Sequence, residues 1–355
     1  MDYPSKLKEL LEISIKEQAS DLHLSVFHPP ILRINGKLVP LMKFKTLSRE
    51  DTTGLAAALL TQDQFQRFSQ DKDIDFSYNF ENKSRFRVNV FFQTGDISIA
   101  MRLIPSKIKT IEELSLPLIL HQFAASSQGF VLITGPSSHG KSTTLAALID
   151  EINHTRADHV ITIEDPIEYI FEDDRSVIDQ REVFQDAATF ARALRATFRQ
   201  DPDVIMVGEM RDPETMAIAI TAAETGHLVF ATLHTNSASQ TIHRIVDSFA
   251  PEQQGQVRSQ LSGSLLGVVS QRLVPRLKGG LIPACEIMLS NPAVANLIRE
   301  NKIHELPLVI ETSGEAGMIS LNRSLADLVK RKEISLENAM IYSLNPSELR
   351  MLVRA

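Results

Sequence analysis

The sequence has almost no cysteine and no tryptophan: Cys285 is the single cysteine among 355 residues. One cysteine excludes an internal disulfide framework and a four-cysteine zinc site, and it suits a reducing compartment. No apolar run approaches the ~18–20 residues that a membrane-spanning helix needs. The N-terminal MDYPSKLKEL is charged and amphipathic, without the apolar centre of a secretory signal. We therefore expect a cytoplasmic protein without an integral membrane segment.

An excess of positive charge is also missing. The chain has 37 Lys and Arg against 44 Asp and Glu, which gives a formal net charge of −7. It lacks the dense basic stripe with which most nucleic-acid-binding proteins neutralise phosphates, so nucleic acid is not expected as the main partner. The hydrophobic content of 43% is ordinary for a globular chain, and the length suits two domains of ~100–200 residues each.

The apolar pattern divides the chain. Residues 1–104 predict a small α+β domain, in which amphipathic helices near residues 5 and 48 accompany strands at 21–25, 31–34, 74–80, 86–92 and 97–104, with a hairpin turn at Asn35-Gly36. Residues 105–118 are polar and contain two prolines, which predicts a linker. Residues 119–275 alternate continuous apolar runs with helical periods, typical of a parallel sheet covered on both faces. Residues 276–355 predict a mostly helical C-terminal region, and the fold class is α/β.

One segment matches a phosphate-binding loop, G-x-x-x-x-G-K-[ST]. It follows a buried apolar run, precedes an amphipathic helical segment, and consists of Gly135, Pro136, Ser137, Ser138, His139, Gly140, Lys141, Ser142 and the adjoining Thr143. Backbone N–H groups and a helix N-terminus at such a loop favour bound phosphate. We expect Lys141 to reach the β- and γ-phosphates of ATP, and the Ser142 hydroxyl to bind Mg²⁺.

His139 is an unusual residue for this loop. It precedes Gly140, where a small side chain would be more natural. We expect the imidazole to point to solvent. The sharper alternative is an effect of its protonation on nucleotide binding.

Three further apolar runs, at 160–163, 204–207 and 228–233, are followed by residues that can act on a phosphate: Glu164, Glu209 and His234. Ligands of parallel sheets bind beyond the carboxyl ends of the strands. These side chains therefore converge on the terminal phosphates if their strands neighbour the loop strand. We assign Glu164 to the attacking water, Glu209 to the Mg²⁺ shell and His234 to sensing the phosphate; the two glutamate roles are exchangeable.

Four other residues keep two interpretations each. Arg85 and Arg87 are two apart on an expected strand and share a face, and Arg102 lies on the next strand. An arginine against the γ-phosphate stabilises the charge of transfer and can come from a neighbouring subunit. From the residues alone, a solvated and salt-bridged face is the simpler interpretation. His227, which opens the run that ends before His234, is equally a structural hydrogen-bonding histidine or a functional one.

Several sequence boxes occur in a specific order. They are ASDLHLS, RFRVNVF and MRLIPSK before residue 108, then the phosphate loop, TIEDPIEY, DPDVIMVGEMRDPET, TGHLVFATLHTNSA and SQRLVPR. With them the chain resembles the secretion-type motor ATPases over essentially its full length, and specifically the PilT-like retraction ATPases of type IV pili. The resemblance implies a PAS-like N-terminal domain, a RecA-like P-loop ATPase domain, a homohexamer, and ATP with Mg²⁺. It also implies functional roles for Arg85, Arg87 and Arg102, and it places Glu164, Glu209, His227 and His234 in the family's acidic and histidine boxes.

The function implied by this resemblance is an ATP-hydrolysing motor that powers pilus retraction and twitching motility. Its expected place is the inner face of the cytoplasmic membrane at the pilus base, and its expected partners are an inner-membrane pilus platform protein and other pilus motor ATPases. The alternatives are an accessory PilU-like ATPase, a pilus-assembly or type II secretion ATPase, a RecA-like DNA motor, and a non-hydrolysing ring subunit.

Two departures from the family pattern bear on these alternatives. Ser138 and His139 replace the glycine and serine of the usual loop, and the change to Ser138 matters because glycine is the permissive residue at left-handed positions. Ala295 stands where the C-terminal motif of the family usually has arginine. The loss of that charge is compatible with the accessory, PilU-like role.

Overall fold

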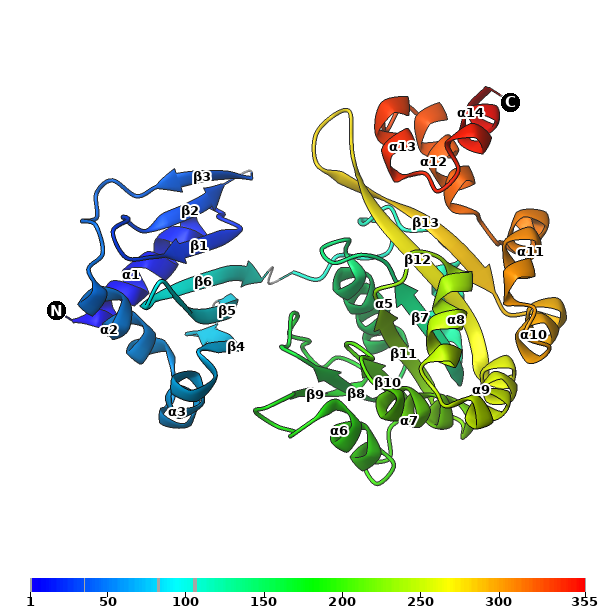
Figure 1. The fold of residues 1–355 in the computed structure, drawn as a ribbon, viewed down its shortest axis with the longest axis horizontal. Helices are drawn as coiled ribbons and strands as arrows, with labels where there is room; N and C mark the ends of the chain where they lie inside the picture. The colour runs from blue at the N-terminus through cyan, green and yellow to red at the C-terminus, as the bar shows by residue number, and fades with distance from the viewer. Residues whose placement is uncertain (1, 35, 82–83, 105–106, 355) are drawn as a thin grey trace. The chain divides into compact units, whose positions relative to one another are not determined.

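The computed structural model describes residues 2–34, 36–81, 84–104 and 107–354, and these form two compact units (Figure 1). Unit 1 comprises Met1–Lys107 together with Pro166–Ile170, and unit 2 comprises Ile108–Asp165 and Phe171–Ala355. Each unit has its own hydrophobic core. The four-part division expected from the sequence remains a prediction. Most of its linker groups with unit 2, and a short segment from beyond the linker groups with unit 1.

Unit 1 is an antiparallel sheet flanked by helices. The described elements are α1 (Tyr3–Lys16), β1 (Asp21–Leu24), β2 (Ile31–Ile34), β3 (Lys37–Pro40), α2 (Arg49–Leu59), α3 (Gln62–Asp71), β4 (Asp73–Phe80), β5 (Ser84–Gln93) and β6 (Asp96–Ile104). The sheet has the order β3-β2-β1-β6-β5-β4, with antiparallel pairs throughout. Helix α2 begins where expected, because Ser48 and Asp51 form a reciprocal capping box. Asn35 of the expected hairpin turn lies outside the described residues.

Unit 2 alternates strands and helices up to residue 264. Its first described elements are α4 (Leu120–Ala125), β7 (Gly129–Thr134), α5 (Lys141–Thr155), β8 (His159–Glu164), β9 (Val177–Glu182), α6 (Phe190–Thr197), β10 (Val204–Val207), α7 (Pro213–Glu224), β11 (Leu228–Leu233), α8 (Ala238–Asp247) and α9 (Pro251–Ser264). They are followed by β12 (Leu265–Pro275), β13 (Leu281–Leu289), α10 (Pro292–Arg299), η1 (Ile303–Glu305), α11 (Leu306–Thr312), η2 (Gly314–Ala316), α12 (Leu321–Lys330), α13 (Leu336–Tyr342) and α14 (Pro346–Arg354).

The sheet of unit 2 has the order β13-β12-β7-β11-β10-β8-β9. Strands β12 to β9 in this order run parallel, and β13 is an antiparallel edge. Every residue of β7, β10 and β11 is buried, as expected for continuous apolar strands covered on both faces. The sequence predicts that residues 276–355 are mostly helical. Their first element is the long strand β13, and the elements that follow it are helices. Helices α12 to α14 share a smaller apolar cluster with β12 and β13.

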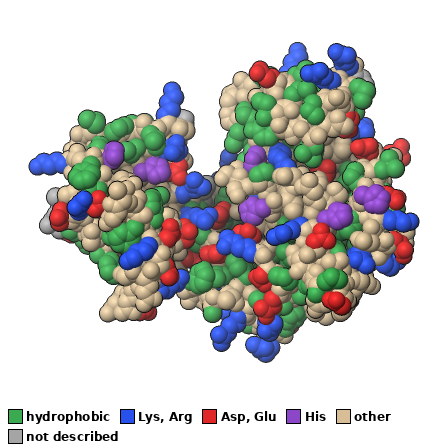
Figure 2. All heavy atoms as spheres, in the orientation of Figure 1, with side chains coloured by type: hydrophobic (Ala, Val, Ile, Leu, Met, Phe, Trp, Pro, Cys, Tyr) green, Lys and Arg blue, Asp and Glu red, His purple; other side chains and the backbone are tan. Residues whose placement is uncertain are grey.

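None of the helices in the described ranges combines the length and the apolar character that crossing a lipid bilayer requires. On the face of the molecule shown in Figure 2, lysine and arginine side chains are interspersed with acidic ones.

Candidate functional site

The phosphate loop is held against β12 so closely that two of its positions require glycine. Gly135 has φ +143°, and a Cβ atom there would lie 2.4 Å from the backbone oxygen of Gln271. Gly140 has φ +82° and is the N-cap of α5, and a Cβ atom there would lie 2.8 Å from Gln271 Nε2. The loop backbone therefore follows the surface of β12 and continues directly into the first turn of α5.

Gly135→Ala is expected to lower the free energy of unfolding of unit 2 by about 2 kcal/mol, because the new methyl group meets backbone that cannot turn away. Urea unfolding measures this change. Gly263→Ala is the matched control, since Gly263 lies in α9 with open space around it, and it should stabilise by about 0.5–1 kcal/mol. Equal midpoints for the two variants would contradict the close contact.

Lys141 is 8% exposed and lies inside the loop that it terminates. Its Nζ donates hydrogen bonds to Gly135 O at 2.9 Å and Pro136 O at 3.0 Å. The ammonium group is thus already at the loop, within a small rotation of any phosphate that the loop N–H groups bind.

His234 connects the loop to Glu209. Strand β11 is the direct neighbour of β7, so the residue that follows β11 emerges beside the loop. His234 Nδ1 lies 3.4 Å from both Lys141 Nζ and Ser137 Oγ, while its Nε2 lies 3.2 Å from Glu209 Oε1. On the far side, Arg211 Nη2 donates to Glu209 Oε2 at 2.9 Å. Sequence reasoning named His234 and Glu209 but missed Arg211, which follows two residues after Glu209.

The surroundings of Glu209 keep it ionised. Burial alone would raise the pKa of this carboxyl, but hydrogen bonds and positive charge from Arg211, with a smaller contribution from His234, outweigh burial and lower the pKa below its ordinary value. A carboxylate in this state can accept a proton from water only weakly, but it is well suited to attract a cation or orient a water molecule.

Glu164 occupies a different place at the same sheet edge. Strand β8 is separated from β7 by β11 and β10, so the condition that all three strands directly neighbour the loop strand holds only for β11. The Glu164 carboxylate is 6% exposed and accepts from Thr162 Oγ1 at 2.7 Å and Gln180 Nε2 at 3.3 Å. The structure thus brings Glu209 and His234 to Lys141 and holds Glu164 next to β9.

The three arginines make contacts within unit 1. Arg85 donates to Ser77 Oγ, Arg87 Nη1 lies 3.3 Å from Glu168 Oε1, and Arg102 Nε lies 3.0 Å from Asp21 Oδ1. The Arg102 and Arg87 contacts fit the salt-bridged interpretation, and a role toward a phosphate remains a hypothesis.

His227 lies at the opposite end of β11 from His234. A six-residue strand separates the two histidines, which corresponds to about 20 Å. His227 Nδ1 is 2.9 Å from Ala222 O, and Phe198 meets its ring edge to face at 5.8 Å. These contacts favour the structural interpretation within one chain.

The oxygen donors expected for Mg²⁺ fit that ion. Ser142 lies in the first turn of α5, and Glu209 is an ionised carboxylate. Within the described residues, three or more His, Cys, Asp or Glu side chains do not gather into a metal cluster. Mg²⁺ does not need such a cluster, because it usually binds one or two protein oxygens together with water and substrate phosphates.

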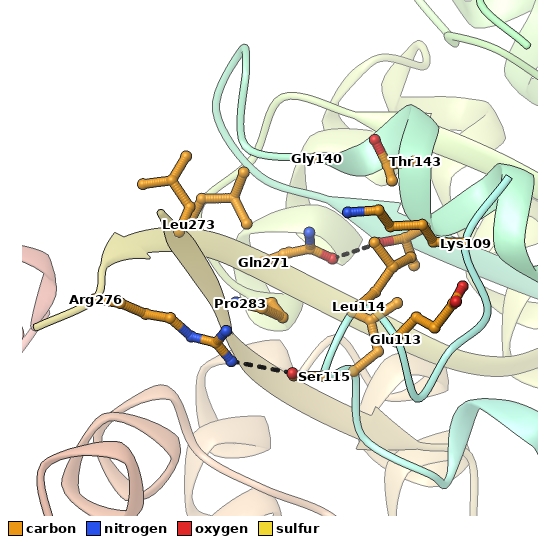
Figure 3. Close-up of a pocket in the computed structure, with 13 residues that line it drawn as sticks. Lys109, Glu113, Leu114, Ser115, Gly140, Thr143, Gln271, Leu273, Arg276 and Pro283 are labelled. Atoms are coloured by element: carbon orange, nitrogen blue, oxygen red, sulfur yellow. Dashed lines mark hydrogen bonds between the residues drawn. The ribbon is translucent and has the colours of Figure 1, made fainter. Parts of the chain in front are cut away.

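A pocket of about 250 Å³ adjoins the loop, and sequence reasoning did not find it (Figure 3). One wall comes from the expected linker and others come from the loop, α5, β12 and β13; the lining residues are Lys109, Glu113, Leu114, Ser115, Leu116, Gly140, Thr143, Thr144, Gln271, Leu273, Arg276, Leu281 and Pro283. Hydrogen bonds from Arg276 to Ser115 (3.1 Å) and from Thr144 to Gln271 (2.8 Å) tie these walls together. Leucine and proline faces with a few polar groups suit the base and ribose of a nucleotide.

The expectation that His139 points to solvent is wrong. Its Nδ1 accepts a hydrogen bond from Leu273 N at 2.8 Å, and its ring meets Tyr342 edge to face at 6.2 Å. The preceding Ser138 adopts φ +64°, in the left-handed region that glycine occupies more readily. His139 is therefore accommodated by contacts with β12 and α13, which the sequence of the loop does not contain, and Ser138 is accommodated in a left-handed conformation.

Comparison with known proteins shows what the whole chain is similar to. The family model described as "Type II/IV secretion system protein" matches residues 4–331. The type IV pilus retraction ATPase PilT of Pseudomonas aeruginosa is 45% identical over 94% of this chain and 96% of its own length, and the type IV pilus ATPase PilU of the same organism is 38% identical over 98% and 91%. The crystal structure of the pilus retraction motor PilT with bound ADP superposes with a TM-score of 0.90 at 45% identity, covering 97% of this chain and 98% of that one.

Proposed function

Because the chain belongs to the Type II/IV secretion system protein family, we propose that it is an ATP-hydrolysing motor that powers retraction of type IV pili and thereby twitching motility. The observation that carries this proposal is the nearly full-length likeness to a retraction ATPase. The assembly of Lys141, His234 and Glu209 at a glycine-dependent loop supplies the chemistry that such a motor needs.

The nucleotide binds with its phosphates in the loop and its base and ribose in the adjoining pocket. The likeness to a structure with bound ADP and the fit of the pocket both support this placement. Lys141 turns from the loop carbonyls to the β- and γ-phosphates, where its charge counters the charge that develops during transfer. Magnesium, held by Ser142 and Glu209 when bound, supplies further neutralisation of the phosphates.

Glu164 and Glu209 divide the remaining tasks. Glu164 orients the attacking water, and its hydrogen bonds from Thr162 and Gln180 hold the carboxylate in one orientation. His234 contacts both Glu209 and Lys141. Loss of the γ-phosphate beside Lys141 therefore shifts this imidazole, and with it Glu209, which follows β10. Arg85, Arg87 and Arg102 act on the phosphates of a nucleotide only if unit 1 of the same or a neighbouring subunit approaches them, and this remains part of the proposal.

The working assembly is proposed to be a homohexamer at the inner face of the cytoplasmic membrane, gripping a pilus platform protein. Unit 1 is proposed to be the PAS-like domain, given its antiparallel sheet with α2 and α3 inserted between β3 and β4. Unit 2 is proposed to be the RecA-like ATPase domain, given its parallel sheet and phosphate loop.

An accessory role like that of PilU is the second candidate. The observation that favours it is Ala295 in α10, where the family motif usually carries arginine. Ala295 is partly exposed on α10, so the missing charge affects what α10 presents to other proteins more than it affects the phosphate loop.

Deletion of the gene is expected to leave cells with surface pili but without twitching. The physical reason is that a retraction motor removes pilin subunits that an assembly motor has already added. Electron microscopy of pili and spreading beneath agar measure the two properties separately. Loss of all surface pili would instead identify an assembly motor, and twitching that persists until a second family member is also deleted would identify the accessory role.

A further inference from the structure

His139 holds the loop to β12 by a contact that the usual loop residues cannot make. The imidazole Nδ1 accepts the N–H of Leu273 at 2.8 Å, and the backbone oxygen of His139 accepts Gln271 Nε2 at 2.9 Å. One residue thus makes hydrogen bonds to the two positions that flank Arg272 in β12. The side chain of serine, which the family usually carries here, is too short to reach the same N–H in place of imidazole.

Gln271, which donates to the His139 backbone oxygen, is itself buried and hydrogen-bonded to α5. Gln271 is 2% exposed, and its Oε1 accepts from Thr144 in the first turns of α5 at 2.8 Å. The loop between Gly135 and Gly140 is therefore bounded at both glycines by Gln271, and the His139 imidazole adds a contact to Leu273 just before Gly140. Ser138, in the left-handed region, lies between these anchors.

We propose that His139 is a positioning residue for nucleotide binding. Its imidazole holds the phosphate loop against β12 in the conformation that receives the phosphates. This inference rests on the proposed function, because it concerns the nucleotide that the motor hydrolyses. The loop of this chain has Ser138 and His139 where the family usually has glycine and serine. The contact to Leu273 N–H restricts the conformations of the free loop, so the loop loses less conformational entropy when a phosphate binds.

Tyr342 extends the contact to the C-terminal helices. It is the last residue of α13, packs beside the apolar cluster of α12 to α14, and meets the His139 ring edge to face. Aromatic pairs of this geometry contribute about 0.5–1.5 kcal/mol. A shift of α13 therefore alters the support behind the phosphate loop, at a distance from the phosphates themselves.

The contact requires neutral imidazole, because protonated Nδ1 would present a second N–H to the N–H of Leu273. Burial, and then the positive charges of Arg272 and Lys141, lower the pKa of His139 below its ordinary value. The folded state thus favours the neutral form. The contact is complete at a pH above the ordinary value of about 6.5, and it is lost as the pH falls through the lowered pKa of the folded state, which lies below that value.

Three substitutions separate a hydrogen-bonding role from simple space filling. His139→Asn places Oδ1 where Nδ1 stands, whereas His139→Leu fills space without an acceptor and His139→Ala does neither. With ADP carrying a fluorescent N-methylanthraniloyl group as the probe, the alanine and leucine variants should bind about tenfold more weakly than the unaltered protein. The asparagine variant should recover to within about threefold, and it should lack the additional weakening below pH 6.5 that the unaltered protein shows.

Recovery by leucine and not by asparagine would overturn the hydrogen-bonding role, as would equal affinity in all four proteins. Failure of the unaltered protein to bind the probe would instead overturn the proposed function. A readout without nucleotide separates the two: ¹⁵N chemical shifts of the His139 imidazole should report the Nε2–H tautomer. The Nδ1–H tautomer would overturn the inference whatever the nucleotide does.

Discussion

Lys141→Ala is expected to reduce ATP turnover by about 1,000-fold. The side chain is 8% exposed and lies among the loop carbonyls, so its charge sits where the terminal phosphates bind and is little screened by water. Phosphate release by purified protein at saturating ATP measures the loss. Binding of ADP should weaken as well, because the ammonium is proposed to contact the β-phosphate, which ADP retains.

Lys278→Ala is the matched control. Lys278 is an exposed lysine in the turn between β12 and β13, so its removal changes the net charge by the same amount without touching the loop. Its turnover should stay within twofold of the unaltered protein. Turnover in the Lys141 variant within tenfold of the unaltered protein would show that the phosphates lie elsewhere.

Glu209→Gln is expected to lower turnover by about 100- to 1,000-fold while leaving ADP affinity nearly intact. Glutamine keeps the shape, but its single oxygen can accept from only one of the two donors, Arg211 or His234, and it loses the charge that attracts Mg²⁺ and orients water. Comparing turnover with ADP affinity isolates the chemical step from nucleotide binding. Circular dichroism confirms that the variant is folded.

Glu164→Gln and the double variant complete this test. Glu164 lies beyond Glu209 along the sheet edge, so the two single losses should differ in size if the carboxylates have different tasks. Glu214→Gln is the control, because Glu214 pairs with Arg195 on the exposed start of α7. Undiminished turnover in the Glu164 and Glu209 double variant would show that neither carboxylate takes part.

The local parts of this fold are predictable because their signals are local. Strands β7, β10 and β11 are continuous apolar runs, and the loop motif depends on residues within eight positions of one another. The start of α2 follows from Ser48 and Asp51, three residues apart. In each case the physics that decides the structure acts between neighbours in the sequence.

The rest depends on contacts between distant positions. Strand β12 interrupts its apolar pattern with Ser270, Gln271 and Arg272, all buried. Gln271 donates to the loop at His139 O, and Arg272 donates to Asn236 after β11. The sequence near residue 139 does not show that its imidazole accepts a hydrogen bond from Leu273, which lies 134 positions away. The pocket likewise joins residues 109–116 to β13, so no short window contains it.

The segment Pro166–Ile170 belongs to unit 1, although its neighbours on both sides belong to unit 2. The covalent chain consequently passes between the units at three places instead of one. A fragment that begins after Lys107 would carry this segment without the surface that buries Ile167, and a fragment that ends there would leave Arg87 without Glu168. Separate expression of either half is therefore expected to yield less soluble protein than the intact chain, and dissecting this motor calls for point substitutions instead of truncation.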